Sequence, residues 1–282
     1  MTANISDIEI APLKPDDIGN AQRLSANLNW PHRLEDWQFL EALGDGFGAY
    51  RGSELVGTSY CWPHSETLAT LGMVIVSPSL QGRGIGAALT RRAMEAAGSR
   101  TILLNATDAG LPLYARLGFR EFGQVRQHQG VIDSAPEITG VEDVAVRAFR
   151  EGDIELVETL DSAATGFVRK ALLAALANVA EGAVLEDGER ATGYALIRPF
   201  GRGRSIGPVV APTVTGARAL IAALLQDEIG RFVRIDTPVA ELSPWLDAIG
   251  MKFASPVTAM VHGDLPRGSG GRLFGLVSQA LG

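Results

Sequence analysis

Cysteine is nearly absent from this chain of 282 residues, which contains only Cys61. A single cysteine excludes a disulfide within the chain and argues against a cysteine-based metal site. Cys61 lies in an apolar stretch, where a free cysteine usually packs as a small hydrophobic side chain. We therefore expect neither a disulfide nor a bound metal.

Lysine is also scarce, and acidic residues outnumber basic ones by 32 to 25. The formal net charge is −7, and no basic run alternates with aromatic residues. Both features argue against a surface that binds nucleic acid. One local group of arginines, Arg198, Arg202 and Arg204, is most simply explained as a solvated hairpin turn.

Long hydrophobic runs are missing as well. No apolar stretch approaches the ~20 residues that span a bilayer, and the first residues do not follow a basic-then-apolar signal pattern. Hydrophobic residues make up 46% and charged residues 20% of the chain, which is typical of a globular protein. We expect a cytoplasmic protein without membrane or nucleic-acid partners, long enough for two domains.

One glycine-rich stretch has the pattern of an anion-binding element. The apolar run Met73–Val76 predicts a buried strand that ends before Pro78. A glycine-rich turn over residues 81–86 follows, and residues 87–97 carry apolar side chains at helical spacing. Glycines in such a turn allow backbone N–H groups to converge on an anion at the positive end of the helix.

The patterns around this stretch predict an α/β (α+β) fold, with a mixed, mostly antiparallel sheet flanked by helices. Strands are expected at residues 8–11, 47–51, 55–62, 68–76, 101–105 and 119–128. Helices are expected at about 17–28, 35–43, 87–97 and 110–117. Short connections make the three strands between residues 47 and 76 antiparallel. The strand at 101–105 follows a helical crossover and should run parallel to the strand at 68–76.

The same order begins again in the second half of the chain. Residues 10–18 correspond to 146–154, residues 72–76 to 207–211, and residues 117–119 to 249–251. These offsets lie between 132 and 136 residues, and a repeat of this length predicts two copies of one fold. We place the first domain at residues 1–131, a linker at 132–143 and the second domain at 144–282.

Two familiar phosphate-binding loops do not match residues 81–87. The Walker pattern ends in Gly-Lys-Ser/Thr, and this stretch contains no lysine. A dinucleotide-binding fingerprint can be placed on Gly82, Gly84 and Ala87, but it needs an acidic residue about 20 positions further on and crossovers in the preceding strands. The chain has Asn105 there and hairpins before the loop, so a nicotinamide-dependent oxidoreductase is the weaker alternative.

The segment Gln81-Gly82-Arg83-Gly84-Ile85-Gly86 resembles the Gln/Arg-x-x-Gly-x-Gly/Ala loop of the GCN5-related N-acetyltransferase (GNAT) superfamily, which binds the pyrophosphate of acetyl-CoA. Downstream, Leu113-Tyr114-Ala115-Arg116-Leu117-Gly118-Phe119 resembles the closing Leu-Tyr-x-x-x-Gly-Phe motif of the same family. The resemblance covers about residues 5–130 and, through the repeat, the remainder more weakly. The whole chain resembles a tandem GNAT protein with a diverged second domain.

The resemblance implies which residues bind the cofactor. Backbone groups of residues 74–76 would pair with the pantetheine arm and polarise the thioester carbonyl, a task for which a preorganised N–H is suited. The amides of residues 82–87 would hold the pyrophosphate, with Arg83 partly neutralising it. The implied cofactor-binding residues are Val74, Ile75, Val76, Gln81, Gly82, Arg83, Gly84, Ile85, Gly86, Ala87 and Asn105.

Tyr114 corresponds to the tyrosine that, in the family, donates a proton to the departing thiolate of CoA. A phenol with a pKa of about 10 can protonate a thiolate whose conjugate acid has a pKa of about 8.5 only if the site adjusts both. A tyrosine that only packs against the cofactor is the alternative. Many members carry Asn seven residues before this tyrosine, where this chain has Thr107; Asn105 could serve the cofactor or a water instead.

A general base for an amine acceptor is expected, but the sequence does not identify it. The candidates are His32, Asp36, His64, Asp108 and His128. Trp30, His32 and Asp36 are the candidates for the acceptor pocket. Trp37, beside them, is more simply explained by packing of its helix against the core.

The second domain has lost residues that this chemistry needs. Arg218 and Leu220 stand in place of Gly84 and Gly86, and their side chains would block close backbone approach. Pro208 removes an N–H from the strand that corresponds to residues 72–76. Leu246 stands in place of Tyr114. We expect this domain not to be catalytic, and to shape the acceptor pocket or pack against its partner.

The sequence thus predicts an acetyl-CoA-dependent N-acetyltransferase, an acyltransferase that needs no metal. It would acetylate the amine of a small molecule by direct attack in a ternary complex, as a monomer or homodimer. The alternative is a non-catalytic acyl-CoA-binding sensor or regulatory protein.

Overall fold

The first half of the chain folds in the order that its patterns predict. The computed structural model describes residues 7–137 and 144–282. The strands are β1 (Ile8–Pro12), β2 (Asp45–Arg51), β3 (Glu54–Pro63), β4 (Leu68–Val76), β5 (Thr101–Ala106) and β6 (Arg120–Val131). The helices are α1 (Ile18–Ala26), α2 (Leu34–Glu41), α3 (Ile85–Ala97) and α4 (Leu111–Arg116).

The second half repeats this order and adds one strand after it. Its strands are β7 (Val144–Ala148), β8 (Glu181–Asp187), β9 (Arg190–Phe200), β10 (Gly203–Ala211), β11 (Phe232–Thr237), β12 (Lys252–His262) and the added β13 (Arg272–Gly275). Its helices are α5 (Ile154–Thr165), α6 (Lys170–Ala177), α7 (Val214–Leu225) and α8 (Ser243–Ala248). Residues 138–143 of the predicted linker lie outside the described residues.

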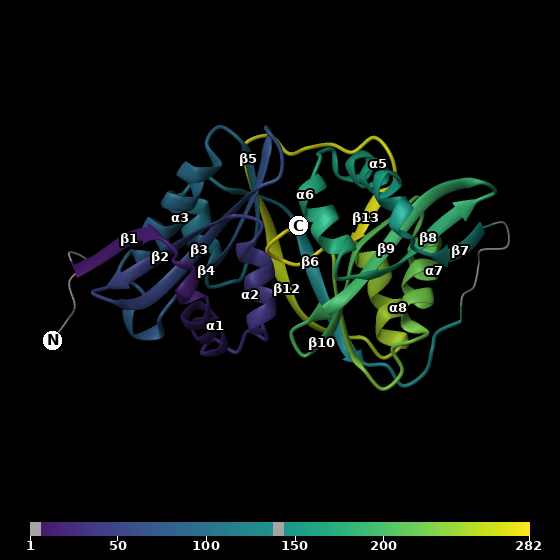
Figure 1. Ribbon diagram of the computed structural model, residues 1–282, viewed down its shortest axis with the longest axis horizontal. Helices are drawn as coiled ribbons and strands as arrows, with labels where there is room; N and C mark the ends of the chain where they lie inside the picture. The colour runs from purple at the N-terminus through teal and green to yellow at the C-terminus, as the bar shows by residue number, and fades with distance from the viewer. Residues whose placement is uncertain (1–6, 138–143) are drawn as a thin grey trace.

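One mixed sheet of thirteen strands runs through both halves of the elongated molecule (Figure 1). The strand order is β1-β2-β3-β4-β5-β12-β6-β11-β10-β9-β8-β7, with β13 beside β10. The hairpins β2-β3 and β3-β4 are antiparallel, and β5 runs parallel to β4. The predicted mixed α/β fold, with its antiparallel hairpins and one parallel crossover, is therefore confirmed.

Two strands are exchanged between the halves at the centre of the molecule (Figure 1). Strand β12, from the second half, lies between β5 and β6, and β6, from the first half, lies between β12 and β11. All three of these contacts are antiparallel. Each half therefore completes the sheet of the other, and side chains of β6 and β12 face a region that both halves share.

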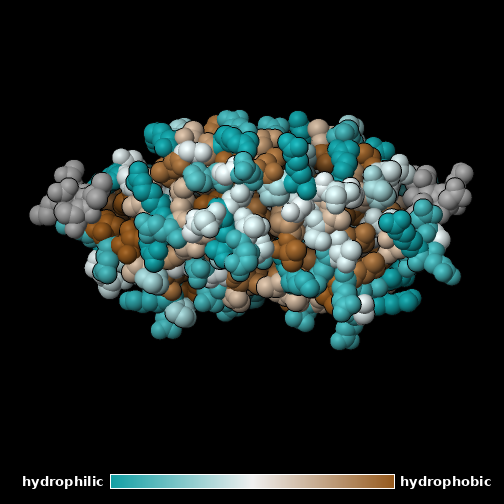
Figure 2. Space-filling model, turned by 90° about the horizontal axis from the view of Figure 1, so that it is seen from above, coloured by the Kyte–Doolittle hydropathy of each residue, from teal (hydrophilic) through white to brown (hydrophobic). Residues whose placement is uncertain are grey.

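Helices cover the sheet on both faces. Helix α3 packs against the strands of the first half through residues such as Leu89 and Ala93, and α7 does the same in the second half through Leu220 and Leu225. A core of aromatic and aliphatic residues joins α1 and α2 to α6 and β9 across the halves. Hydrophilic and apolar residues are intermingled on the face seen from above (Figure 2).

Trp37 of α2 belongs to this shared core, as predicted. Its side chain is fully buried, and its indole N–H donates a hydrogen bond to the Ser25 hydroxyl at 3.1 Å. A buried indole needs such a partner. Trp37 therefore supports the fold and does not form a wall of a pocket.

Asp36, at the start of α2, also ties the halves together. Its buried carboxylate accepts hydrogen bonds from the Arg33 backbone amide at 2.8 Å and from the Gly201 amide of the second half at 2.9 Å. The Arg33 side chain donates to it as well. Burial alone would raise the pKa of Asp36, but these hydrogen bonds outweigh burial and lower the pKa overall.

Replacing Asp36 by asparagine should lower the free energy of unfolding at pH 7 by about 1.5–3 kcal/mol, because hydrogen bonds to a charged group are lost. A carboxyl group whose folded-state pKa is lowered stabilises the fold above the unfolded-state pKa of about 3.9, and this contribution disappears as the pH falls through the folded-state pKa. Urea unfolding of the variant should therefore depend less on pH in the acidic range. Asp187→Asn, at the exposed end of β8, is the control; equal losses in both variants would contradict the assignment.

Candidate functional site

The candidate site begins where the parallel strands β4 and β5 separate. Their pairing runs from Leu68 and Thr101 to Thr70 and Leu103 and stops there. Beyond this point the two strands continue to Val76 and Ala106 without pairing to each other. Backbone groups on facing edges of β4 and β5 are therefore available to something other than the sheet.

A β-bulge in β4 lies at the same point. Two residues of β4, Met73 and Val74, stand opposite the single residue Ser59 of β3. Met73 has a φ of +51°, which is rare for a residue with a large side chain. The Thr58 hydroxyl donates a hydrogen bond to the Met73 carbonyl at 2.8 Å and holds this conformation. Bulges of this kind redirect backbone and side-chain groups next to active sites.

The predicted glycine-rich loop connects β4 to α3. Gly82 and Gly84 have φ values of +75° and +82°, which favour glycine. Gly84 is the N-cap of α3, and no side chain caps the helix. The Gln81 side chain instead donates to the Val76 carbonyl at 3.1 Å and fixes the loop. The first amides of α3 are thus free to bind an anion at the positive end of the helix.

A cavity of about 470 Å³, here called the α3 cavity, lies between this loop, the bulge of β4 and α4. It is lined by Leu28, Trp30, Leu71, Gly72, Met73, Val74, Val76, Leu80, Gln81, Gly82, Gly84, Ile85, Gly86, Ala87, Asn105, Thr107, Ala109, Gly110, Leu113, Tyr114 and Arg116. Nine of the eleven predicted cofactor-binding residues are among them. The other two are Ile75, which is buried in the core, and Arg83, a residue of the loop whose guanidinium lies near the Ser79 carbonyl.

Tyr114 lines the α3 cavity from α4. Its ring packs edge-on against Phe119, and Gly110 is required beside it, because a Cβ at Gly110 would lie 2.9 Å from the ring. The Tyr114 hydroxyl makes no hydrogen bond within the described part of the chain. Burial raises the pKa of the Tyr114 phenol above its usual value. The phenol is therefore protonated at neutral pH. Because a raised pKa also makes it a weaker acid, proton donation to a thiolate requires that the bound thiolate itself become more basic in the site.

A second cavity of about 530 Å³, here called the central cavity, adjoins the α3 cavity. The two share Trp30, Gly72, Met73, Asn105, Thr107 and Ala109, at the bulge and at the end of β5. The remaining lining residues come from both halves: Asn29, Pro31, His32, Asp108, Gln127, Gln129, Phe200, Arg202, Arg234, Ser255, Pro256, Val257, Ser278, Gln279 and Ala280. The strand exchange and the segment after β13 bring these residues together.

Two of the five candidate bases line the central cavity, His32 and Asp108. Asp108 is exposed, in the loop after β5. Burial, together with the charge of Arg234, lowers the pKa of His32 to about 4. Its Nδ1 is buried and finds no hydrogen-bond partner in the described residues. His32 is therefore a neutral imidazole at physiological pH.

The other three candidate bases lie outside both cavities. Asp36 is engaged by Arg33 and Gly201 as described above. His64 makes a hydrogen bond with the Thr70 hydroxyl at 2.9 Å, and burial lowers its pKa to about 3. The fully buried His128 is bound through its two ring nitrogens to the Met251 carbonyl and the Ser243 hydroxyl. These contacts give all three side chains a structural role.

Several polar residues of the central cavity were not anticipated as site residues. Gln127 and Gln129 alternate along β6 with the inward-facing His128, and this period of two could have predicted that they share a face. The interpretation of the arginines near residue 200 as a solvated turn is wrong for two of the three. Arg198 is buried, 3.9 Å from Asp36.

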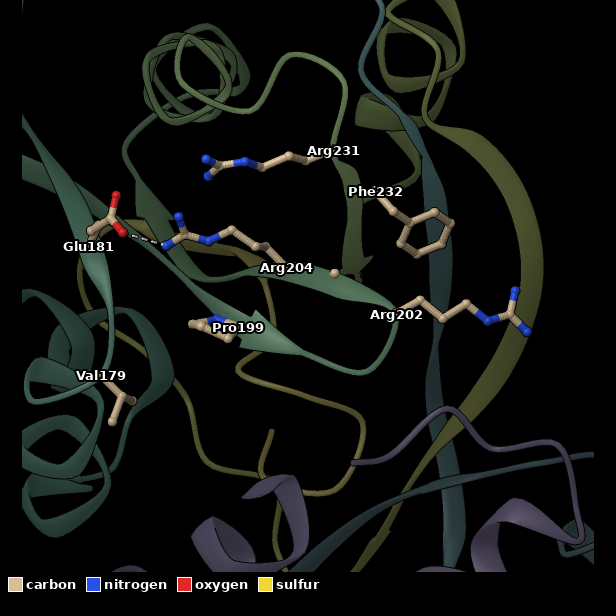
Figure 3. A pocket seen from close by; sticks show the side chains of 8 residues that line it. Val179, Glu181, Pro199, Arg202, Arg204, Arg231 and Phe232 are labelled. Carbon is tan, nitrogen blue, oxygen red and sulfur yellow. Dashed lines mark hydrogen bonds and ion pairs between the residues drawn. The ribbon is translucent and has the colours of Figure 1, made fainter. Parts of the chain in front are cut away.

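Arg204 is the second arginine for which a solvated turn is the wrong interpretation. It lies in a hollow of about 480 Å³ on the second half (Figure 3). It forms ion pairs of 2.8 Å with both Glu181 and the buried Glu228. Its charge is therefore balanced within the fold. Arg202 is exposed, and Figure 3 shows its side chain extending away from Arg204 and Glu181.

In the second half, the chain itself fills the region that corresponds to the α3 cavity. The Thr213 hydroxyl accepts a hydrogen bond from the Gly216 amide at 3.0 Å and so caps α7. Strand β13 pairs with β10 along residues 209–211. The Leu276 amide then donates to the Asp236 carbonyl of β11 at 2.8 Å. These contacts close the helix end and the strand gap that the first half leaves open.

The described residues give no sign of a metal centre or a membrane span. Across residues 7–137 and 144–282, no three His, Cys, Asp or Glu side chains are grouped so that they could hold a metal ion. None of the helices in these ranges is long and apolar enough to cross a bilayer.

Comparisons with known proteins agree with this geometry. Models of the "Acetyltransferase (GNAT) domain" match residues 43–121 and, separately, residues 157–275. The chain is 28% identical to the uncharacterized N-acetyltransferase YitH of Bacillus subtilis, over 97% of this chain and 98% of that protein. It is 25% identical to the holothin acyltransferase of a Pseudoalteromonas species, over 89% of this chain and 93% of that protein.

A solved structure has the same overall fold. It is a putative acetyltransferase from Pyrococcus horikoshii, which matches with a TM-score of 0.80 and 23% identity, over 100% of this chain and 98% of that one. The first family model spans the glycine-rich loop and Tyr114, and the second spans β8 to β13. The chain therefore belongs to the GNAT acetyltransferases and carries two GNAT domains in tandem.

Proposed function

We propose that this protein is an acetyl-CoA-dependent N-acetyltransferase that acetylates the amine of a small molecule by direct attack in a ternary complex. The observation that carries the proposal is the meeting of two cavities at the bulge of β4 and the end of β5. Two molecules bound in them would have their reacting groups side by side. Holding reactants in this way converts a bimolecular step into an effectively unimolecular one.

The residues of the α3 cavity suit acetyl-CoA. The uncapped amides of residues 84–87 suit its pyrophosphate, and the gap between β4 and β5 offers unpaired backbone groups to its pantetheine arm. When bound, acetyl-CoA supplies an activated acetyl group as a thioester. Backbone groups released by the bulge at Met73 can polarise a carbonyl oxygen there, and Tyr114 can donate a proton to a thiolate.

The first domain would be catalytic, and the second would shape the acceptor site. The capped α7 and the strand gap closed by residues 272–276 support this division. The second half also supplies a wall of the central cavity through Phe200, Arg202 and Arg234. Residue ranges of 1–131 and 144–282 for the two domains stay a prediction, with β6 and β12 exchanged between them.

The size of the central cavity favours a small acceptor. Its volume of about 530 Å³ lies within the range of about 300–1,000 Å³ that is usual for small-molecule sites. Residues from both halves line it, and a recess of this size suits a small molecule better than the side of a folded protein. Trp30 supplies an aromatic wall at the junction of the two cavities.

Within the central cavity, His32 would orient the acceptor amine and Asp108 would accept its proton. A neutral His32 can accept a hydrogen bond from the amine and so orient it, but its low pKa makes it a poor proton acceptor near pH 7. Asp108 is the carboxylate in the cavity lining. It is the group that we assign to receive the proton, directly or through a water.

Thiol release from acetyl-CoA tests this function. The protein is incubated with acetyl-CoA and a panel of amines, amino acids and polyamines, and free thiol and acetylated product are measured. We expect both to appear in equal amounts with at least one acceptor. Acetyl-CoA at 100 times its Kd should also stabilise the fold by about 2.7 kcal/mol, whereas NAD(P) should not. Stabilisation without thiol release would instead favour an acyl-CoA-binding sensor.

A further inference from the structure

The acidic and basic residues that line the central cavity come from different halves of the chain. Asp108 belongs to the first half and stands between Thr107 and Ala109, which line both cavities. Arg202 and Arg234 belong to the second half and line the central cavity from that side; Arg202 also lines the neighbouring hollow that contains Arg204. The cavity thus has an acidic side chain near the junction with the α3 cavity and two basic side chains on the wall that the second half provides.

Within residues 7–137 and 144–282, Arg202 has no internal partner. No hydrogen bond or ion pair involves its guanidinium in the described part of the chain, although the nearby Arg204 forms ion pairs with Glu181 and Glu228. Its side chain turns away from those acids (Figure 3). A guanidinium presents a planar set of donors that matches a carboxylate, and that of Arg202 is free to use them.

Arg234 is held in place but keeps donors available. Its side chain is 11% exposed. Its Nε and Nη2 donate to the carboxylate of Asp236 at 2.9 and 3.0 Å, and its guanidinium lies over the Phe200 ring, 5.5 Å from the centroid. Its Nη1 makes no hydrogen bond in the described residues and is not among the buried unpaired atoms. The Nη1 donors are therefore open to the cavity that Arg234 lines.

Both arginine and aspartate charges near this wall act on His32, and the Asp36 charge opposes those of Arg234 and Arg198. Asp236, which balances Arg234, is buried and also accepts a hydrogen bond from the Gln279 side chain at 3.0 Å. The charges of Arg234 and Arg198 add to burial in lowering the pKa of His32.

We propose that the acceptor is an amine that also bears a carboxylate, bound by Arg202 and by Nη1 of Arg234. The carboxylate end would lie on the wall from the second half, and the amine end would lie toward Asp108 and the bulge of β4. Amino acids and related zwitterions have this arrangement of charges. The inference rests on the proposed function and makes the second domain the part that selects the acceptor.

Matched acceptors test this inference. The thiol-release assay is run with amino acids, their carboxamides and the corresponding decarboxylated amines. We expect kcat/KM to be about 10- to 100-fold higher for the acids, since hydrogen bonds between charged groups carry the difference. Arg202→Gln should raise KM for the acid by a similar factor, with kcat and the KM for acetyl-CoA unchanged, and Arg202→Lys should restore part of the loss.

Arg231→Gln is the matched control, because Arg231 is exposed in the neighbouring hollow (Figure 3) and does not line the central cavity. It should behave as the unaltered protein does. The inference is overturned if decarboxylated amines are acetylated as well as the acids, or if Arg202→Gln and Arg231→Gln have the same KM; the acetyltransferase proposal then still stands. Acetyl-CoA binding without turnover of any amine in the panel would overturn both.

Discussion

Replacing Gly86 by glutamate should abolish the binding of acetyl-CoA. Gly86 lies in the first turn of α3 and lines the α3 cavity. Its φ is not in the left-handed region, and a Cβ there would lie 3.5 Å from Leu113 and 3.7 Å from Val76, at ordinary contact distance. The backbone therefore accepts a side chain, and glutamate is a better helix former than glycine. The fold should remain intact.

The loss of acetyl-CoA affinity would come from the negative charge of the new side chain and from the volume that it occupies. A carboxylate would stand at the amides proposed to bind the pyrophosphate, and like charges in a partly buried site repel strongly. We expect the Kd measured by isothermal titration calorimetry to rise at least about 1,000-fold, which corresponds to about 4 kcal/mol. Thermal unfolding without ligand should be close to that of the unaltered protein. Normal binding by Gly86→Glu would place the pyrophosphate elsewhere.

Two further variants separate the possible causes. Gly86→Ala adds a Cβ without charge and should retain most of the affinity. Thr215→Glu places the same carboxylate in the exposed first turn of α7. Because α7 begins at Val214, Thr215 is the structural counterpart of Gly86. The predicted counterparts Arg218 and Leu220 lie inside the helix, so that alignment of the two loops is wrong. Thr215→Glu should leave binding unchanged, because Thr213 already caps α7. If Thr215→Glu also abolished binding, the second half would take part in binding acetyl-CoA.

The α3 cavity was largely predictable because one continuous stretch of sequence forms it. The apolar strand, the glycines at positive φ and the start of α3 are all local features, and each leaves a local pattern. Gly82 and Gly84 adopt the backbone conformation for which glycine is suited. The bulge at Met73 could not be predicted from the sequence, because methionine has no preference for the positive φ that it adopts there.

The central cavity was much less predictable, because it depends on contacts between distant residues. Gln129 and Arg234 lie opposite each other only because β6 pairs with β11. Backbone hydrogen bonds in a sheet do not depend on which half supplies the neighbouring strand. Asp36 and Asp108 illustrate the same limit. Both are acids beside a helix start, but the amide that engages Asp36 belongs to Gly201, 165 residues away.

Replacing Tyr114 by phenylalanine should lower kcat for acetyl transfer by about 100-fold or more, the range usual for loss of a general acid. The ring would keep its contact with Phe119, so the Kd for acetyl-CoA should not change. Because burial raises the pKa of Tyr114, the phenol stays protonated up to at least about pH 10. The rate of the unaltered enzyme should therefore rise with pH as the amine deprotonates, with no decline from this group.

Tyr50→Phe controls for general effects of removing a buried hydroxyl. Tyr50 is buried in the first half and donates a hydrogen bond to Asp17 at 2.9 Å, outside both cavities. Its loss should cost about 1 kcal/mol of stability and leave kcat unchanged. If Tyr114→Phe retained full kcat, Tyr114 would be a packing residue, and the thiolate would have to take its proton from water. A large loss of kcat at constant Kd would leave proton donation as the explanation, because the phenylalanine preserves every contact of the ring and removes only the hydroxyl.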